Sequence, residues 1–592
     1  MKRYRPTVQE IELLMAVALK TVPADLVIQN ARLVNVYTGE ILPQTSVWVK
    51  QKWIAYVGND RAAAIGPTTQ VIEADGRVLA PGFIDGHTHL VWMLTVPEFI
   101  RYAAPGGTTT VISETMEAYP VAGLEGVLDV LGSFGDQPIK IFGTAPAMVS
   151  TSQAATGMPA DDLAAILDQE AVLGLGESYW QAVLQTPERY LPAMVATLDR
   201  GKTLEGHSAG ARDKKLCAYL ACGVSSCHEP ISAPEVLERI RLGLYVMIRE
   251  GSIRRDLAAI AAIRDAAVDT RRLILCTDGV GPADLVEKGY MEYVVQKAVD
   301  SGFAPVSAIQ MATLNVAEHF GIDGIVGGIA PGRCADMILL PELTRIVPDL
   351  VISNGRVIAE KQALLAAPRT HPYTQANHRT VRLPEALPPS TFAIRTNAKS
   401  GTVTVRAIDM VTDLVTREIQ LDVTPAAGTI LADPQSGLLK VAALDRSRNP
   451  GKTFTGLIRG FGLQRGALAA SSAWDTFDII AVGADDGDLA AAVNHIAKLQ
   501  GGAVYCVDGA VVDEIPMPIL GIISELPVPE LARRLGAMNK ALAGAGCTFP
   551  DPLLALVALT GAAIPFLRIC EEGLVDFKSG KTLGLFPDPA AG

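Results

Sequence analysis

Short apolar segments recur between residues 78 and 279, and each is followed by a stretch whose apolar residues have helical spacing. Runs of this kind are typical of strands buried on both faces. Eight of them can be counted, at residues 78–89, 107–113, 139–147, 172–178, 202–208, 223–229, 244–250 and 273–279. Two further helical stretches follow, at residues 284–302 and 305–321. The alternation predicts an α/β fold, a parallel (β/α)8 TIM-like barrel with an outer ring of helices.

Two similar segments flank this barrel. Residues 26–35, LVIQNARLVN, and residues 350–359, LVISNGRVIA, are both apolar runs broken by an Asn-centred turn. We expect them to build one small β-domain from N-terminal and post-barrel parts of the chain. Near the start, residues 11–19 are apolar with Glu10 and Glu12 at their edge, which predicts an amphipathic helix rather than a signal peptide.

These patterns predict five parts of the chain. A Pro-rich stretch separates the small β-domain from a last region with both strand-like and helical segments, such as residues 477–483 and 529–546. The predicted parts are a helix with the first part of the small β-domain (1–77), a metal-dependent barrel (78–330), the second part of the small β-domain (331–370), a linker (371–389) and a C-terminal α+β domain (390–592).

Length and charge narrow the classes of function. A chain of 592 residues exceeds what one core usually supports, so several domains are expected. The net charge of −12, without a basic stripe, argues against a nucleic-acid partner. No apolar run has the length of a membrane span, so no membrane partner is expected. Eight scattered cysteines without a paired framework favour a reducing cytoplasm.

Imidazole and carboxylate side chains end five of the eight predicted strands. Residues two apart in a strand point to the same face, and the carboxyl ends of barrel strands meet at one rim. A single histidine at such a place is more often structural than a ligand, but five strand ends carrying these groups together favour a metal centre. The predicted ligands are His87, His89, Glu177, His207, His228 and Asp278.

The donor types suit Zn, Mn or Fe, and six donors exceed the needs of one tetrahedral ion. We therefore expect two divalent ions, with Glu177 as the bridging carboxylate. Such a pair lowers the pKa of a shared water enough to give hydroxide near neutral pH, so the predicted chemistry is hydrolysis. Asp278 is the candidate to take the proton of that water and deliver it to a leaving nitrogen. The alternative for Asp278 is a helix N-cap in CTDGVGPADL.

The motifs of the chain resemble those of the adenine deaminase family of the amidohydrolase superfamily. PGFIDGHTH, GTTTVI, LGLGES, GHSAG, SSCHEP, MIREGS, LCTDG, AIQMATLNVAEHFG and IAPGRCADMILL stand in the family's order, followed by GLIRGFGLQRGALAASSAWDTFDIIAVG and CTFPDPLLAL. The resemblance covers nearly the whole chain. It implies the same six ligands, a binuclear site, and hydrolytic conversion of adenine to hypoxanthine and ammonia.

Departures from the family's pattern cluster where a substrate would lie. Val91 and Trp92 follow the HxH pair where polar residues are usual, and Trp474 begins a block that the family usually starts with histidine. Asp278 is followed by Gly279 rather than by a second aspartate. We expect Glu229 to be the second catalytic residue. The expected substrate-binding residues are Trp92, Glu114, Tyr179, Trp180 and Arg249. The structural alternatives are that Trp92 and Trp180 pack against helices and that Arg249 forms an ion pair.

Three functions stay open on these residues. The first is hydrolytic deamination of adenine. The second is hydrolysis of a different nitrogen heterocycle, such as a cyclic amide, an imide or another aminated ring, because buried polar groups that match a ring decide between similar substrates. The third is a binding protein on this scaffold that has lost catalysis. The expected partner is a small heterocyclic molecule, and a homo-oligomer is expected.

Overall fold

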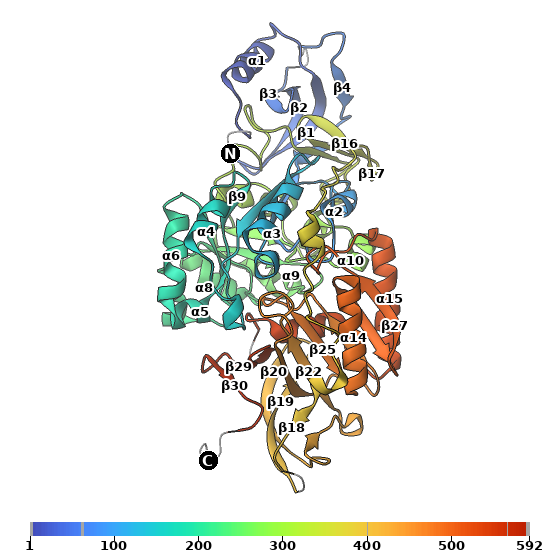
Figure 1. The fold of residues 1–592 in the computed structure, drawn as a ribbon. Helices are drawn as coiled ribbons and strands as arrows, with labels where there is room; N and C mark the ends of the chain where they lie inside the picture. Colours follow the sequence, from blue (N-terminus) through green and yellow to red (C-terminus); the bar gives the residue numbers. More distant parts are fainter. Residues whose placement is uncertain (1–3, 61–63, 399–400, 565, 588–592) are drawn as a thin grey trace.

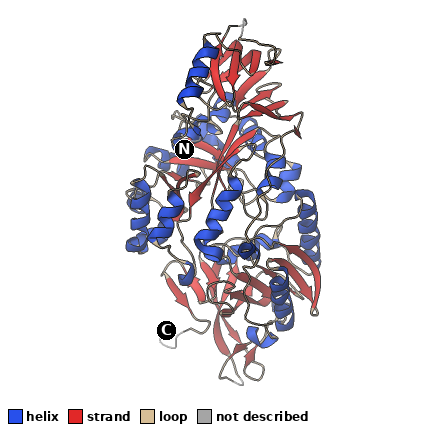
Figure 2. Ribbon diagram, turned by 45° about the horizontal axis from the view of Figure 1, so that its top comes forward, coloured by secondary structure: helices blue, strands red, loops and turns tan. Residues whose placement is uncertain are grey.

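The computed structural model describes residues 4–60, 64–398, 401–564 and 566–587. Figure 1 shows three regions along one long axis: a small β-domain, a central barrel and a C-terminal domain. In Figure 2 helices surround the strands of the central region, whereas the two end regions are dominated by sheet.

The eight predicted barrel strands are present and parallel. Their bounds are β6 (Phe83–Thr88), β7 (Thr108–Ser113), β8 (Lys140–Ala145), β9 (Val172–Tyr179), β10 (Thr203–His207), β11 (Ser226–Cys227), β12 (Tyr245–Arg249) and β13 (Leu273–Cys276). The order β6-β7-β8-β9-β10 continues into β11-β12-β13 where the Ser225 amide donates to the Leu204 carbonyl (3.0 Å). The barrel closes where the Asp278 amide donates to the His87 carbonyl (3.0 Å). The predicted α/β barrel is confirmed.

Helices cover the outside of this barrel. They are α2 (Val96–Ala103), α3 (Tyr119–Phe134), α4 (Ala160–Leu167), α5 (Trp180–Gln185), α6 (Pro187–Leu198), α7 (Asp213–Leu220), α8 (Ala233–Arg241), α9 (Leu257–Ile260), α10 (Pro282–Glu287), α11 (Met291–Asp300), α12 (Pro305–Met311) and α13 (Leu314–His319). The apolar faces of these helices and of the strands form one large core, because parallel strands are covered on both faces.

The first predicted strand, residues 78–89, is two strands in the structure. β5 (Val78–Pro81) belongs to the sheet of the small domain, and only β6 enters the barrel. The chain divides at Gly82, where a Cβ atom would lie 2.3 Å from Oγ1 of Thr109. Only glycine permits this close approach, so the small domain and the barrel join at this point without a linker.

The small β-domain is one sheet with the order β17-β16-β15-β14-β5-β1-β2-β3, and β4 pairs with β1. Its strands are β1 (Leu26–Asn35), β2 (Glu40–Lys50), β3 (Trp53–Gly58), β4 (Gln70–Glu73), β5, β14 (Met337–Leu340), β15 (Leu350–Ser353), β16 (Arg356–Glu360) and β17 (Ala363–Leu364). Both predicted segments therefore lie in one sheet, but the asparagine of each segment has a different structural role. Asn30 (φ 58°) makes an irregularity within the continuous β1, whereas Asn354 and Gly355 (φ 50° and 73°) form a tight turn between β15 and β16.

The N-terminal helix α1 (Val8–Ala18) rests on this sheet. Its start is fixed by a reciprocal cap, because Thr7 Oγ1 accepts from the Glu10 amide (3.3 Å) and Glu10 Oε2 accepts from the Thr7 amide (2.7 Å). The side chains of Leu14 and Val17 on this helix are buried.

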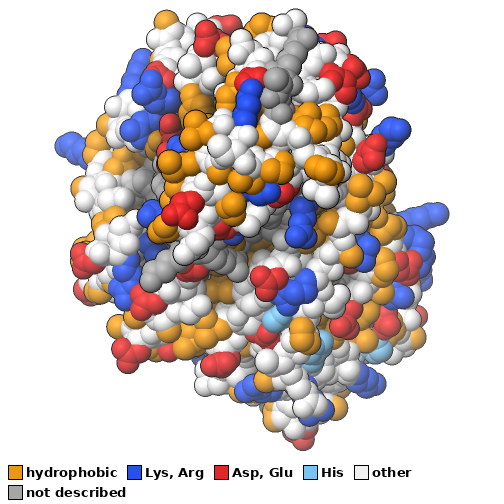
Figure 3. Space-filling view, turned by 90° about the horizontal axis from the view of Figure 1, so that it is seen from above, with side chains coloured by type: hydrophobic (Ala, Val, Ile, Leu, Met, Phe, Trp, Pro, Cys, Tyr) orange, Lys and Arg blue, Asp and Glu red, His pale blue; other side chains and the backbone are white. Residues whose placement is uncertain are grey.

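Among the described helices of the chain, none is long and apolar enough to cross a bilayer. Figure 3, which looks onto the molecule from above, shows basic and acidic side chains interspersed with hydrophobic ones.

The segment after the small domain runs along the barrel and includes the short helices η4 (Gln375–His378) and η5 (Pro389–Phe392). Asp129 on α3 holds it. The Asp129 carboxylate accepts hydrogen bonds from His371 Nε2 (2.6 Å), the Thr374 amide (2.9 Å) and Asn377 Nδ2 (2.6 Å). Burial opposes its ionisation, but these donors hold the pKa of Asp129 below its usual value. The predicted linker is thus a docked segment.

The C-terminal domain is built on an eight-stranded sheet with the order β20-β19-β23-β22-β25-β24-β26-β27. Its strands are β19 (Val403–Met410), β20 (Thr416–Val423), β22 (Leu438–Leu444), β23 (Thr453–Arg459), β24 (Ala467–Ala470), β25 (Ile479–Gly483), β26 (Gly502–Val507) and β27 (Ala510–Pro516). The long helices α14 (Asp486–Leu499) and α15 (Val528–Gly544) pack beside it, and α16 (Pro552–Val557) follows. Short strands complete the region: β18 (Ile394–Arg395), β21 (Thr429–Ile430), β28 (Leu567–Cys570), β29 (Gly573–Asp576) and β30 (Lys581–Leu583).

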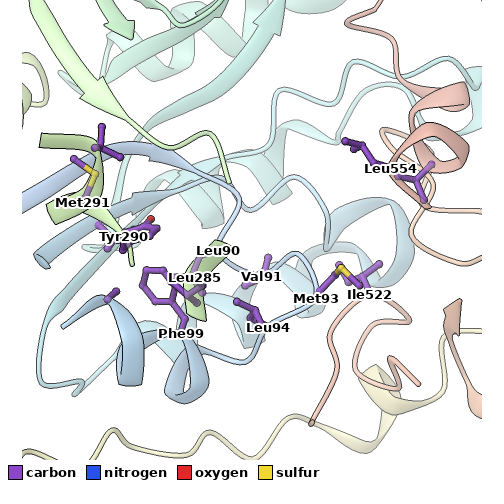
Figure 4. Packing of buried hydrophobic residues seen from close by; sticks show 14 of the residues in the cluster. Leu90, Val91, Met93, Leu94, Phe99, Leu285, Tyr290, Met291, Ile522 and Leu554 are labelled. Atoms are coloured by element: carbon purple, nitrogen blue, oxygen red, sulfur yellow. The ribbon is translucent and has the colours of Figure 1, made fainter. Parts of the chain in front are cut away.

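The loop after β6 joins the barrel to this domain. The Met93 amide donates to the Ile522 carbonyl (3.1 Å), and the Ser524 amide donates to the Met93 carbonyl (3.1 Å). Figure 4 shows Met93 beside Ile522, while Leu90 and Phe99 pack toward Leu285. The segment that directly follows the two histidines of the first barrel strand is therefore fixed from both sides.

Candidate metal centre

The barrel gathers the six predicted ligands at the carboxyl ends of its strands. His87 lies near the end of β6 with His89 just beyond it, Glu177 near the end of β9, His207 at the end of β10, His228 directly after β11 and Asp278 two residues after β13. His89 is partly buried and the other five are buried. Residues separated by almost two hundred positions thus face one another.

Glu177 lies between two imidazoles. Its Oε1 is 3.2 Å from His89 Nε2, and its Oε2 is 3.4 Å from His228 Nε2. One carboxylate therefore presents a separate oxygen to each ring. A carboxylate that held two cations would present its oxygens in this way.

Asp278 faces the same histidines from the last strand. Its Oδ1 is 3.3 Å from His87 Nε2 and 3.6 Å from His89 Nε2, and its Oδ2 is 3.2 Å from an Nη atom of Arg249. The backbone of Asp278 is left-handed (φ 58°), a conformation that aspartate tolerates better than most residues. The helix that follows is preceded by Gly281 at its N-cap position, so Asp278 is not a helix cap.

Three sets of donors lie close enough to hold a cation, with all donor atoms of a set within 4.8 Å of one another. The sets are Glu177 with His207, His228 and Glu229; His87 with His228 and Asp278; and His87 with His89 and Glu177. Nε2 of His87 and Oε1 of Glu229 are buried without a hydrogen-bond partner. Unpartnered polar atoms are costly in a protein interior, so these residues fit a bound metal ion.

Two further carboxylates support the donor residues. Glu117 Oε1 lies 2.6 Å from His89 Nδ1. Glu114 accepts from Thr144 Oγ1 (2.8 Å) and from the Glu177 amide (3.3 Å), and it lies 3.7 Å from His87 Nδ1. Burial, and then the charge of Glu177, raise the pKa of Glu114 to about 8. Both carboxylates orient rings or backbone of the donor residues.

A cavity of about 380 Å³ opens in front of the donors. Of the residues expected to bind substrate, Trp92, Tyr179 and Arg249 line this cavity, and so does Glu229. The structure does not bring the other two expected residues to its wall.

Glu114 lies behind the donors, because its carboxylate is turned toward Thr144 and the backbone of Glu177. Trp180 begins helix α5, and its indole N–H donates to the Ala209 carbonyl (2.7 Å) while Lys215 lies 5.4 Å from the ring centre. Trp180 therefore packs against its neighbours, the structural alternative for this residue. Arg249 agrees with both roles considered for it, substrate binding and ion pairing. It lines the cavity, and it also pairs with Asp256 (2.9 Å).

The C-terminal domain supplies part of the cavity wall. Trp474, Asp475 and Phe477 lie on the loop between β24 and β25, and the hydroxyl of Tyr179 donates to Asp475 Oδ1 (2.8 Å). Burial raises the pKa of Asp475 to about 7. The sequence predicts no role for these three residues. The departure from the family's pattern that begins at Trp474 does, however, indicate this loop.

Comparison with known proteins agrees with this geometry. The amidohydrolase family matches residues 78–358, and the adenine deaminase C-terminal domain matches residues 413–581. The first match contains all six donors and the second contains the loop that reaches the cavity.

Relatives of similar length match almost end to end. A protein named adenine deaminase from Moorella thermoacetica is 37% identical over 98% of this chain and 99% of its own length. Proteins of the same name from Cenarchaeum symbiosum and Paracoccus denitrificans are each 36% identical, over 97% of this chain and over 95% and 97% of their own lengths. The chain belongs to the adenine deaminase family, within the metal-dependent amidohydrolases.

Proposed function

We propose that the protein catalyses hydrolytic deamination, in which adenine and water give hypoxanthine and ammonia. The observation that carries this proposal is the position of Glu177, whose two oxygens each face a different histidine beside a cavity. Full-length relatives named for this reaction support the choice of adenine. A binding protein without catalysis would have no need of so many buried donors at one point.

We further propose that the site holds two divalent ions, and that the donor types favour Mn, Fe or Zn. The proposed ligands are His87, His89, Glu177, His207, His228 and Asp278. When bound, such ions supply Lewis acidity, which lowers the pKa of water and polarises the bond under attack. The overlap of the donor sets at Glu177 and His228 supports two ions rather than one.

Asp278 is the proposed proton carrier. It takes a proton from the attacking water and delivers it to the amino group that leaves. Burial opposes its ionisation, but the charge of His228, the close contact with His87 and the charge of Arg249 hold the pKa of Asp278 below its usual value. The carboxylate therefore starts the reaction unprotonated, and Arg249 keeps one of its oxygens turned away from the histidines.

Glu229 is proposed to hold the ring of the substrate. Its Oε2 accepts from the Ser208 amide (2.6 Å), which fixes the carboxylate at the cavity wall and leaves Oε1 without a hydrogen-bond partner. A ring N–H of the purine is a suitable donor to Oε1. Oε1 also lies 2.8 Å from His228 Nε2 without forming a hydrogen bond to it, so a ring bound there would lie directly beside the donor residues.

Metal removal and reloading test the proposal. The purified protein is treated with a chelator, reloaded with Mn, Fe or Zn, and assayed for ammonia and hypoxanthine with adenine as substrate. The reloaded protein is expected to release both products in equal amounts, and His228→Asn is expected to lose this activity. His495→Asn, at a histidine of the C-terminal domain that pairs with Glu514, is the control. Failure of all three metals to give product rules out the proposed reaction.

A further inference from the structure

The cavity in front of the donor residues has two unlike walls. The barrel side presents the histidines and the carboxylates. The opposite side is apolar and comes mostly from the C-terminal domain: Trp92, Leu414, Val415, Trp474, Phe477 and Ile564. Within the described part of the C-terminal domain, Asp475 is the one polar side chain that lines the cavity, and its carboxylate already accepts from the Tyr179 hydroxyl and the Ala562 amide.

The two tryptophans of the apolar wall contact each other across the domain boundary. Their rings are 6.3 Å apart between centres and are inclined at 73°, an edge-to-face arrangement. The backbone on both sides is fixed. Met93, next to Trp92, exchanges backbone hydrogen bonds with residues 522 and 524, and the Trp474 amide donates to the Val557 carbonyl (3.0 Å). The wall is thus a built surface rather than a set of loose side chains.

The loop that carries Trp474 is held in an unusual conformation. Asp475 and Phe477 both have left-handed backbones, with φ of 59° and 51°. Asp475 is kept there because its carboxylate accepts from the Tyr179 hydroxyl and from the Ala562 amide. Non-glycine residues in this region store strain, which persists where the surrounding structure enforces it and is frequent at ligand sites.

An apolar wall suits a substrate larger than a purine base. A base is a single flat bicyclic ring with nitrogens around its edge, whereas a cavity of about 380 Å³ has the size of sites that enclose drug-sized molecules. The indole N–H of Trp92 is buried without a hydrogen-bond partner, and apart from the indole N–H of Trp474 the other side chains of this wall offer carbon. Adenine alone would leave the wall facing water.

We infer that the preferred substrate is an adenine-like aminated heterocycle with an apolar substituent, and that the substituent packs against the Trp92–Trp474 pair. This inference rests on the proposed function, because it assigns a substrate class to the same hydrolytic site. One added methyl or methylene group in an apolar pocket changes kcat/KM by roughly 10- to 200-fold. A substituent that fills the wall is therefore enough to reverse the preference for adenine.

The reaction balances for either position of the substituent. On the exocyclic nitrogen, water and an N6-alkyladenine give hypoxanthine and the alkylamine. On a ring carbon, water and the alkyladenine give the alkylhypoxanthine and ammonia. In both cases the carbon–nitrogen bond of the amino group breaks, oxygen from water takes its place, and the leaving nitrogen takes the proton.

A substrate panel tests the inference with the metal-loaded full-length protein. The panel contains adenine, N6-methyladenine, N6-benzyladenine, 2-methyladenine and 8-methyladenine, with products separated by chromatography. At least one substituted adenine is expected to exceed adenine in kcat/KM by about 10-fold or more. The inference is overturned if adenine has the highest kcat/KM of the panel. That result leaves the proposed deamination intact, whereas no turnover of any member removes the proposed function itself.

Variants of the apolar wall provide the second test. Trp474→Ala and Leu414→Ala are expected to lower the ratio of kcat/KM for the best substituted adenine over adenine by about 10-fold each. Leu431→Ala, at an exposed leucine of the same domain, is the matched control and should leave the ratio unchanged. Two variants are used in case one of them misfolds, and circular dichroism checks the fold of both. An unchanged ratio in both folded variants overturns the inference.

Discussion

Glu117 and Glu177 approach the ring of His89 from opposite sides. Glu117 Oε1 lies 2.6 Å from Nδ1, and Glu177 Oε1 lies 3.2 Å from Nε2. The first contact fixes the orientation of the ring, so that Nε2 faces the other donors. Carboxylate–histidine pairs of this kind raise the basicity of a metal-binding imidazole.

Replacement of Glu117 is therefore expected to weaken metal binding without removing a ligand. Glu117→Gln should lower metal affinity by about 10- to 100-fold, the effect of losing an orienting partner. Competition with a fluorescent chelator measures this affinity. Glu125→Gln, at an exposed position on α3, is the control. Equal affinity in the two variants would show that His89 needs no support from Glu117.

Glu177→Gln should reduce activity more than Glu117→Gln does. A neutral amide then replaces the carboxylate that faces both His89 and His228. We expect turnover to fall by at least about 100-fold and the bound metal to fall below the wild-type amount, while the fold stays intact. Activity assays, elemental analysis and circular dichroism make the three measurements. Wild-type turnover by this variant would contradict a bridging role.

Asp278→Asn removes the proposed proton carrier. The expected loss in kcat is about 10²- to 10⁴-fold, the usual contribution of a positioned acid or base. KM should change much less, since Glu229 still holds the ring. Steady-state kinetics separate the two constants. A variant that raises KM but keeps kcat would place Asp278 in binding rather than in proton transfer.

Tyr179→Phe tests the link between the barrel and the C-terminal loop. Without the hydroxyl, Asp475 loses a donor in a buried place, at a cost of about 1–3 kcal/mol in the free energy of unfolding. Denaturant titration measures this cost. Tyr102→Phe, at a half-buried tyrosine of α2, is the control. An unchanged midpoint for both variants would mean that the Tyr179–Asp475 bond adds nothing to stability.

Asp129→Asn should release the docked segment after the small domain. Hydrogen bonds to a charged acceptor contribute roughly 1.5–3 kcal/mol, so amide exchange of residues 371–378 is expected to speed up. Because the folded pKa of Asp129 lies below its usual value near 3.8, the advantage of wild type is complete above that value and fades as pH falls through the folded pKa. Exchange measured by mass spectrometry at pH 7 and pH 3 checks both statements.

Asp136→Asn is the matched control for this experiment, since Asp136 is exposed near the end of the same helix. It should leave exchange of residues 371–378 unchanged at both pH values. If Asp129→Asn behaved in the same way, the segment would owe its position to apolar packing instead.

The barrel and its six donors could be predicted from the sequence because both depend on local patterns. Apolar runs mark the strands, and polar residues at their ends mark the rim. The division at Gly82 could not be predicted, since the need for glycine comes from Thr109 on the neighbouring strand.

The cavity wall was predicted less completely. Near the end of β7 the direction of each side chain decides its role: Glu114 points behind the donors, whereas Met116 and Glu117 reach the cavity. Trp474 and Phe477 lie almost three hundred residues beyond the donor glutamate of β9, and only the docking of two domains brings them there. Local periodicity carries no information about such docking.

The last barrel strand meets the first directly at the donors, where Asp278 donates its amide to His87 and Thr277 donates its hydroxyl to Asp85 (2.6 Å). Cations bound there would hold together the edge at which the barrel closes, between β13 and β6. Loading with metal should therefore raise the melting temperature, since a ligand at 100 times its Kd stabilises the folded state by about 2.7 kcal/mol. Opening of that edge would release bound cations and separate the donor residues in one event, so bound metal would stabilise the fold as well as take part in the reaction.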